Sequence, residues 1–247
     1  NLERYVNLEC VKVILPWSTP SMRFCTSELK AAVISAELAR RWPGQRIVCA
    51  NGIRRAESPK RVKATITQDE PRLKTRGTTG INWHPILAWE TEDVFNYCRS
   101  RGFRMHEAYT VYGSSRVSCA FCILGSQSDF LASASCADNQ DIYREMVRLE
   151  IESTFGFQDA HWLADTAPEL LDSETRESVS LAKTKAFLRA ELEAVIPKHM
   201  LYVKGWPVAV PTFEEAQLLA GIRTAMQKLL GVGIRYTEPN EIIARYK

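Results

Sequence analysis

Two cysteines with a spacing suited to chemistry lie within residues 109–125, YTVYGSSRVSCAFCILG. Cys119 and Cys122 form a Cys-x-x-C pair, whose sulfur atoms can bind one metal centre or form a redox-active disulfide. A glycine turn at Gly113 and the cation of Arg116 precede the pair. The pair alone does not distinguish a metal site from a redox site, so other stretches of the chain must be considered.

Two basic stretches lie upstream of the pair. Residues 23–30 have the pattern R-x-C-T-x-x-L-K, and residues 52–61 have the pattern G-x-R-x-x-E-S-x-x-R. Residues 106–122 have the pattern H-x-x-Y-x-x-x-G-x-S-R-x-x-C-x-x-C. In this order the three stretches resemble the phosphoadenosine phosphosulfate (PAPS) reductase-like family of the PP-loop ATP pyrophosphatase, or adenine nucleotide alpha hydrolase, superfamily. The resemblance covers roughly the first half of the chain.

The apolar pattern of the first half predicts an α/β fold. Residues 10–15 and 46–50 are short β-prone runs, and residues 27–42 between them have apolar residues at helical spacing. The predicted inward face of this helix consists of Leu29, Val33, Ile34, Leu38 and Ala39. A strand, helix, strand order indicates a Rossmann-like parallel sheet with ligand groups at the carboxyl ends of its strands. We expect a PAPS reductase-like α/β domain over residues 1–125.

The resemblance also implies a phosphate-binding loop that this sequence does not contain. PP-loop proteins open with a strand that leads into S-G-G-x-D-S, where backbone amides and a helix N-terminus bind phosphate. No such motif occurs in the 247 residues. We expect an N-terminally incomplete PP-loop fold, the sequence being a fragment that begins after the loop. A loop supplied by a partner and a degenerate nucleotide site are the alternatives.

The remaining elements of the first half are less regular. Residues 68–80 are polar and lack periodicity, which predicts a mobile surface loop or lid. Residues 81–89 lead into a helix with Thr91 as its N-cap, and we expect His84 before it to pack and not to bind a ligand. The inward residues of this helix are predicted to be Val94, Phe95 and Cys98.

After Gly125 the sequence becomes mainly helical. The predicted helices cover residues 129–135, 142–152, 174–195 and 212–230, and glycine and proline clusters, one of them at residues 205–207, separate them. We expect residues 126–247 to form a helical C-terminal extension with little chemistry of its own.

The resemblance implies a metal centre on Cys25, Cys119 and Cys122. Cluster-bearing sulfonucleotide reductases bind a four-iron four-sulfur (4Fe-4S) centre with a cysteine pair and a later Cys-x-x-C, and here only Cys25 remains of the first pair. Cys136 is the candidate fourth ligand, or the fourth position stays open. Zinc is the alternative metal because it accepts the same ligands. Three buried, inert thiols are the non-functional alternative; Cys10, Cys49 and Cys98 are expected in the core.

The arginine-rich loop after residues 46–50 is predicted to bind an anion. An arginine at a strand end can bind phosphate or sulfate through two hydrogen bonds, and Glu57 can hold that arginine in place. We expect Arg54, Glu57, Ser58 and Arg61 to act together in this loop.

Further polar residues complete the predicted site. Three cations near the cysteines in the sequence would raise the thiolate character of those cysteines; they are Arg23, Lys30 and Arg116. Structural salt bridges are the alternative role for these cations. His106 would bind phosphate or transfer a proton, or it caps the loop. The candidate catalytic residues are His106, Arg116 and Lys30, and the candidate nucleotide- and anion-binding residues are Arg23, Lys30, Arg54, Glu57, Ser58, Arg61, Tyr109 and Gly113.

Composition narrows the class of protein. The chain is 45% hydrophobic and 25% charged, as in globular proteins, and it has no membrane-length apolar run. Seven cysteines are an odd number, which argues against a secreted disulfide framework, so we expect a cytoplasmic protein. A net charge of +3 does not by itself diagnose nucleic-acid binding.

Two classes of function fit these observations. The first is a sulfur-metabolism enzyme that binds an adenine nucleotide, ATP or PAPS. It would reduce a sulfonucleotide with a thiol reductant, or transfer sulfur from a donor, with nucleic acid as one acceptor. The C-terminal E-C-G-x-H tail of the family's reductases is absent, and no cysteine follows Cys136, which favours transfer or an unassigned reaction. The second class is a non-catalytic nucleotide-binding or regulatory module with a structural zinc site.

Overall fold

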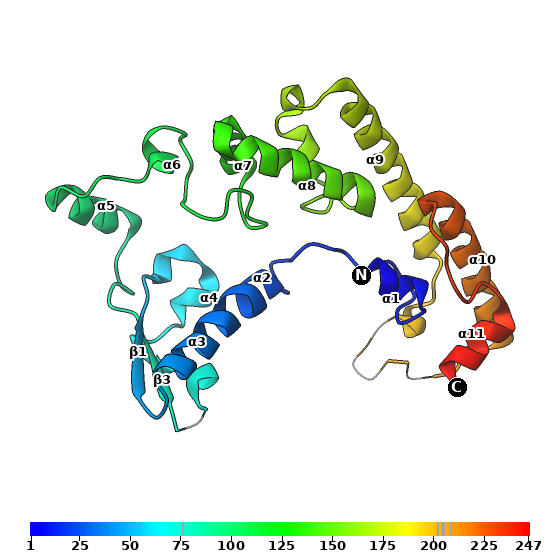
Figure 1. Cartoon of the computed structure of the whole chain (residues 1–247), viewed down its shortest axis with the longest axis horizontal. Helices are drawn as coiled ribbons and strands as arrows, with labels where there is room; N and C mark the ends of the chain where they lie inside the picture. Colours follow the sequence, from blue (N-terminus) through cyan, green and yellow to red (C-terminus); the bar gives the residue numbers. More distant parts are fainter. Residues whose placement is uncertain (76, 202, 204–205, 208) are drawn as a thin grey trace. The chain divides into compact units, whose positions relative to one another are not determined.

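A computed structural model gives the fold of the chain. It describes residues 1–75, 77–201, 203, 206–207 and 209–247. Over these residues the chain is α/β, with a small mixed sheet and a largely helical second half (Figure 1). The predicted fold class, a Rossmann-like core followed by a helical extension, is confirmed. None of the helices described is both long enough and apolar enough to span a bilayer.

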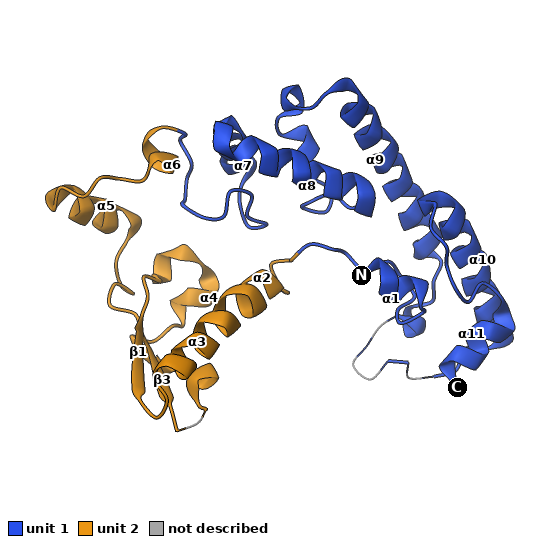
Figure 2. Ribbon diagram, viewed as in Figure 1, with its two compact units in different colours: residues 1–17, 112–247 blue, residues 18–111 orange. Residues whose placement is uncertain are grey.

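The chain forms two compact units (Figure 2). Residues 18–111 form the first, which we call the α/β unit, and residues 1–17 with 112–247 form the second, the helical unit. The boundaries of these units differ from those of the predicted domains 1–125 and 126–247, which stay a prediction.

The sheet of the α/β unit has the strand order β1-β3-β2. β1 (Arg46–Ala50), the strand predicted at these residues, pairs in parallel with β3 (Thr79–Trp83) in a register that places Val48 opposite Ile81. β2 (Thr67–Asp69) pairs antiparallel with β3. The predicted parallel pairing is therefore present between β1 and β3, and β2 adds an antiparallel edge that the sequence did not indicate.

The segment predicted as a loop contains two of these elements. β2, the 3-10 turn Pro71–Leu73 and the start of β3 lie within residues 67–80, while Arg76 lies outside the described residues. The loop prediction failed because β2 is short and all of its residues are exposed. Its sequence therefore has no alternation of apolar and polar side chains, and only backbone pairing with β3 identifies it as a strand. Leu73 anchors the segment, since it is fully buried.

The helix predicted over residues 27–42 is present but differs in its details. α2 (Phe24–Thr26), a π-helical segment (Ser27–Ala32) and α3 (Val33–Arg41) follow one another directly. The predicted inward face was wrong: Ala39 is buried, whereas Leu29, Val33 and Ile34 are each more than half exposed. Helical spacing indicates which apolar side chains share a face, but it does not show whether another element covers that face.

Three short helices complete the α/β unit. α4 (Pro59–Val62) follows the arginine loop, α5 (Thr91–Ser100) follows β3, and α6 (Glu107–Thr110) precedes the cysteine stretch. α5 begins one residue earlier than predicted, because Glu90 and Asp93 form a reciprocal cap and Thr91 is the first helical residue.

The helices predicted for the second half are confirmed. They are α7 (Gln127–Ser135), α8 (Gln140–Ser153), α9 (Ser173–Ala194) and α10 (Phe213–Leu230). α1 (Leu2–Val6) and α11 (Pro239–Tyr246) were not predicted. Of the predicted break at residues 205–207, Gly205 lies outside the described residues. Two hydrophobic clusters stabilise this unit, one around α10 and α11 and the other around α7 and α8.

Residues 10–15 do not form the predicted strand. They have no strand partner among the described residues and belong to the helical unit, where Cys10 and Val11 are buried in the cluster around α10. The backbone N–H of Val13 donates to Glu193 of α9 at 2.7 Å. The predicted burial therefore holds for Cys10 and Val11, which helices and not a sheet cover, whereas residues 12–15 are only partly buried.

Candidate functional site

The arginine loop lies at the carboxyl ends of the two parallel strands. Residues 51–58 follow β1, where the N–H of Asn51 donates to the carbonyl of Trp83 and that of Arg55 to the carbonyl of Leu87. These bonds, of 3.0 and 2.9 Å, join the loop to the chain that leaves β3. Ligands of parallel sheets bind at such carboxyl ends, so the loop is where the sequence predicted it.

Glu57 organises the charges of this loop. Its carboxylate forms an ion pair with Arg61 and lies 3.6 Å from Nη2 of Arg54, and it accepts the backbone N–H of Arg54 at 3.2 Å. Nη1 of Arg54 donates to the hydroxyl of Thr91 at 3.1 Å. A guanidinium has five N–H donors, so Arg54 can bind an anion beside these partners. Ser58 is extended and caps the start of α4 without a side-chain hydrogen bond.

Cys25 lies in α2, directly before the π turn that contains Lys30. Its backbone N–H donates to the hydroxyl of Ser18 at 3.4 Å, and its sulfur is 4.0 Å from the hydroxyl of Thr26. Hydrogen bonding with Ser18 lowers the pKa of the Cys25 thiol, and Thr26 and the charge of Lys30 act in the same direction. π turns occur often at functional sites. Arg23 is the residue before the helix.

The Cys-x-x-C loop belongs to the helical unit. Cys119 is exposed and Cys122 is half-buried, while Phe121 between them is buried. The ring of Phe121 packs at 5.8 Å from that of Tyr143 and at 6.3 Å from that of Phe130. One residue of the motif therefore anchors the loop in the core around α7 and α8, which leaves the thiols at the surface.

Arg116 lies beside the second thiol of this loop. Its Nη2 is 3.8 Å from Sγ of Cys122, and its Nη1 donates to the carbonyl of Leu124 at 3.4 Å. Gly113 has φ +71°, which confirms the glycine turn before the arginine.

The predicted metal ligands are divided between the two units. Cys25 belongs to the α/β unit, whereas Cys119, Cys122 and Cys136 belong to the helical unit. Among the described residues no three His, Cys, Asp or Glu side chains gather as metal ligands. The shared centre on Cys25, Cys119 and Cys122 therefore stays a prediction, as does Cys136 as its fourth ligand.

The histidines have structural partners. Nδ1 of His106 accepts the backbone N–H of Ala108 at 3.1 Å, so His106 caps α6, one of the two alternatives for this residue. Tyr109 packs edge-to-face on Phe95. His84 is 2% exposed and its Nδ1 lies 2.7 Å from the carbonyl oxygen of Thr65, which confirms that it packs within the unit.

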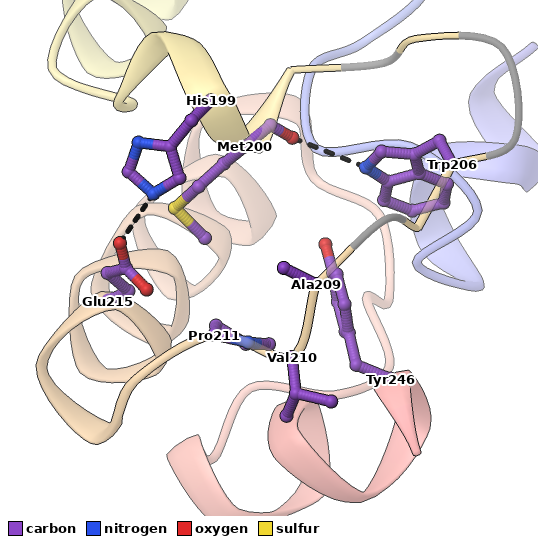
Figure 3. Close-up of a pocket in the computed structure, with 8 residues that line it drawn as sticks. All are labelled: His199, Met200, Trp206, Ala209, Val210, Pro211, Glu215 and Tyr246. Atoms are coloured by element: carbon purple, nitrogen blue, oxygen red, sulfur yellow. Dashed lines mark hydrogen bonds and ion pairs between the residues drawn. The ribbon is translucent and has the colours of Figure 1, made fainter.

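Two pockets among the described residues lie away from the arginine loop. One of about 600 Å³ in the α/β unit lies between the end of α3 and the start of β1, beside Trp42 and Arg46. This is the amino end of β1, opposite to the arginine loop. A second, in the helical unit, lies beside the pair of His199 and Glu215 (Figure 3). Its volume of about 30 Å³ is near that of one water molecule, so it cannot contain a nucleotide.

Sequence reasoning did not find three residues that support the site. Thr91 was assigned to a helix cap, yet its hydroxyl holds Arg54. Asp129 and Gln158 lie in the extension that was expected to have little chemistry, yet both bind the cysteine stretch. The capping pattern from Ser126 to Asp129 was visible in the sequence, but it gives no indication of the other partners of Asp129.

The α/β unit thus combines a mixed sheet with an arginine loop at the carboxyl ends of its two parallel strands. Residues 24–124 match the family model of the phosphoadenosine phosphosulfate reductase domain, which confirms the resemblance over this segment. This family belongs to sulfur metabolism and its members act on a nucleotide. The matched segment includes Cys25, the arginine loop and the Cys-x-x-C pair.

One relative with a curated description is similar to part of the chain. It is the "Uncharacterized 37.8 kDa protein in gpa 5'region" of Escherichia phage 186, which is 30% identical over 112 residues. The alignment covers 43% of this chain and 31% of the phage protein, so the chain spans less than a third of that relative. No solved structure matches the chain.

Proposed function

We propose that the chain is a PAPS reductase-like enzyme of sulfur metabolism that binds an adenine nucleotide or sulfonucleotide at the arginine loop. The observation that supports this most is the position of Glu57, whose carboxylate contacts both Arg54 and Arg61 at the carboxyl end of β1. Two guanidinium groups fixed by one carboxylate form a rigid anion receptor, and such a receptor suits a phosphate or sulfate group.

The cysteines are the proposed second part of the site. The thiols of Cys119 and Cys122, with Arg116 beside one of them, are of a chemical type that binds metal as thiolates. Together with Cys25, and with Cys136 as a further candidate, they would bind a 4Fe-4S cluster or zinc. A cluster would supply electrons for sulfonucleotide reduction or a site for ATP-dependent sulfur transfer. Lys30 and Arg116 would supply positive charge, and Arg23 would lie beside them.

A non-catalytic nucleotide-binding module with structural zinc is the second candidate function. The observation that favours it is the engagement of His106, since Nδ1 of this candidate proton carrier already accepts a backbone N–H. In that case the arginine loop binds a nucleotide but no turnover follows. Iron or zinc content then separates the two candidates.

Calorimetric titration with PAPS, adenosine phosphosulfate and ATP tests the arginine loop. Arg54→Ala and Arg61→Ala should each weaken binding by about 1.5 to 3 kcal/mol, because each removes a charge-assisted contact. Lys60→Ala is the matched control, since Lys60 is an exposed cation of the same loop. Equal affinities in the wild type and both arginine variants would refute the site, and a large fall in Tm would instead make the arginines structural.

Metal analysis of anaerobically purified protein tests the cysteine centre. We expect iron with broad visible absorption, which Cys119→Ser or Cys122→Ser should remove. Cys10→Ser is unsuitable as a control because Cys10 is buried, so Cys49→Ser, a half-buried strand cysteine, serves instead. Stoichiometric zinc without iron would favour the structural module, and a folded protein without metal would exclude both centres.

A further inference from the structure

Asp129, near the start of α7, collects hydrogen bonds from the turn that precedes the Cys-x-x-C pair. Asp129 is 8% exposed. Oδ1 accepts the backbone N–H of Ser115 at 2.8 Å and the hydroxyl of Ser115 at 2.9 Å. Oδ2 accepts the backbone N–H and the hydroxyl of Ser126, at 3.1 and 2.8 Å. One buried carboxylate thus joins the residue before Arg116 to the residue after Gly125.

Gln158 holds the other end of the same stretch. Its Nε2 donates to the carbonyls of Ile123 and Gly125, each at 2.9 Å. The backbone of Gln158 is itself fixed, because it forms a bridge with His161 in the loop that follows α8. Both hydrogens of the Gln158 amide are therefore used on backbone atoms just after Cys122.

These contacts go beyond what a helix cap requires. Asp172 is the cap of α9 in the same unit, and its carboxylate accepts the N–H of Thr175, at the start of its own helix. Asp129 takes part in the cap of α7 in a similar way, since its backbone N–H donates to the hydroxyl of Ser126. Its carboxylate also accepts the backbone N–H of Ser115, which lies eleven residues before Ser126. The additional bonds act on the stretch that contains Arg116 and both thiols.

We propose that Asp129 and Gln158 are positioning residues that keep the guanidinium of Arg116 and the thiols of Cys119 and Cys122 in one fixed arrangement. This inference rests on the proposed function, in which those thiols and that cation act together. The anchors are placed on either side of the stretch, and Phe121 fixes its middle in the core. The helical extension therefore takes part in the site through its side chains.

Competitive alkylation with iodoacetamide, resolved by mass spectrometry of each cysteine peptide, tests the arrangement without nucleotide or metal. In the wild type, exposed Cys119 should react faster than half-buried Cys122. Asp129→Asn and Gln158→Met should each reduce the ratio of the Cys119 rate to the Cys122 rate about tenfold, toward unity. Loss of either anchor allows the loop to open locally, which exposes Cys122. Each variant is assayed at a temperature where melting curves show it to be folded.

Controls separate positioning from general stability. Asp172→Asn and Gln227→Met remove comparable anchors elsewhere in the helical unit, where Gln227 accepts the N–H of Ile234, and both should keep the wild-type ratio. If Asp129→Asn does not fold, Gln158→Met decides the outcome alone. A ratio near unity in the wild type, or a wild-type ratio in both anchor variants, would overturn the proposal.

A cobalt titration links the arrangement to the proposed chemistry. Near-ultraviolet absorption from thiolate-bound Co²⁺ should appear in the wild type. The Co²⁺ concentration that gives half of this absorption should rise about tenfold in Asp129→Asn but not in Asp172→Asn. If the wild type binds neither Co²⁺ nor nucleotide, the proposed function fails, whereas the alkylation ratios still decide whether Asp129 and Gln158 position the loop.

Discussion

The two units of the chain bury their apolar side chains to very different extents. In the helical unit, two clusters of fully buried residues surround α7 to α11. In the α/β unit, the described buried hydrophobic residues are Ala39, Leu73 and Leu87, while Leu29 of the π turn and Val48 of β1 are 67% and 59% exposed. Hydrophobic stabilisation follows the apolar area removed from water, so the helical unit should supply most of the stability.

Polar contacts take a larger part in the α/β unit. His84 lies 2.7 Å from the carbonyl oxygen of Thr65, Asn82 donates to Glu70 at 2.8 Å, and Glu57 contacts the arginines of its loop. The candidate anion-binding groups therefore belong to the unit with little core, whereas the Cys-x-x-C pair belongs to the unit with most of it. Substitutions of the same kind should have unequal effects in the two units.

A pair of phenylalanines gives the largest expected contrast. Phe130 of α7 is 1% exposed and Phe103 of the α/β unit is 59% exposed. Phe130→Ala should lower the free energy of unfolding by about 3 to 5 kcal/mol, because it leaves a cavity in the core. Phe103→Ala should change it by less than about 0.5 kcal/mol. Urea unfolding measures both, and equal losses would show that the α/β unit uses Phe103 as a core residue.

This contrast also explains which parts of the fold could be predicted. The helices of the second half have their apolar residues at regular spacing and end at glycine or proline, so the sequence predicted α7 to α10 to within a few residues. In the α/β unit the same reasoning placed Leu29 and Val33 inward, yet they are exposed. Periodicity identifies an apolar face, but it does not show what covers that face.

The site was predictable only in part for a similar reason. Motif spacing identified the arginine loop and the cysteines, and the strand before the loop placed it at a carboxyl end. The contacts of Thr91, Asp129 and Gln158 join residues that are 14 to 37 positions apart, and local patterns do not specify such pairs. The capping role of His106 was one of two interpretations that the sequence allowed equally.

Two buried or half-buried carboxylates give the next contrast, because they titrate in opposite directions. Glu150 of α8 is fully buried, and burial raises its pKa to about 7 although the backbone N–H groups of Phe157, Leu163 and Ala164 oppose the shift. Burial would also raise the pKa of Glu70 in the α/β unit, but hydrogen bonds from Asn82 and the Arg72 backbone outweigh it and lower that pKa.

The signs of the two contributions follow from these shifts. Between its ordinary pKa and about 7, Glu150 binds more protons in the folded state, so its contribution to stability falls by about 3 kcal/mol as the pH rises through this window. Glu70 contributes stability above its ordinary pKa and loses it as the pH falls through its lowered value.

Unfolding measured from pH 4 to pH 8 should separate the two carboxylates. Glu150→Gln should remove the fall in stability toward neutral pH. It should also lower the free energy of unfolding by the same amount at every pH, because the glutamine amide cannot accept all three backbone N–H groups as well as the carboxyl group does. Glu70→Gln should leave that fall intact and change only the acidic limb. Identical pH profiles for wild type and Glu150→Gln would show that Glu150 has the same pKa in the folded and the unfolded state.

The smallest expected contrast concerns the glycines of the two motifs. Gly113, before Arg116, has φ +71°, and a Cβ added there would meet open space, so only the backbone conformation opposes a substitution. Gly52, which opens the arginine loop, does not have a positive φ, and an added Cβ would meet Ile86 at an ordinary 3.7 Å. Gly113→Ala should therefore cost about 1 to 2 kcal/mol of unfolding free energy, and Gly52→Ala less than about 0.5 kcal/mol.

The two glycine variants should also differ in the reactivity of the Cys-x-x-C thiols, which a melting curve does not report. The strain in Gly113→Ala lies next to Ser114 and Ser115, which Asp129 binds, so the variant should reduce the ratio of Cys119 to Cys122 alkylation in the same direction as Asp129→Asn. Gly52→Ala should leave this ratio and nucleotide affinity near the wild-type values. If Gly113→Ala lowers Tm but keeps the ratio, the turn is fixed by its serines and does not require the left-handed glycine.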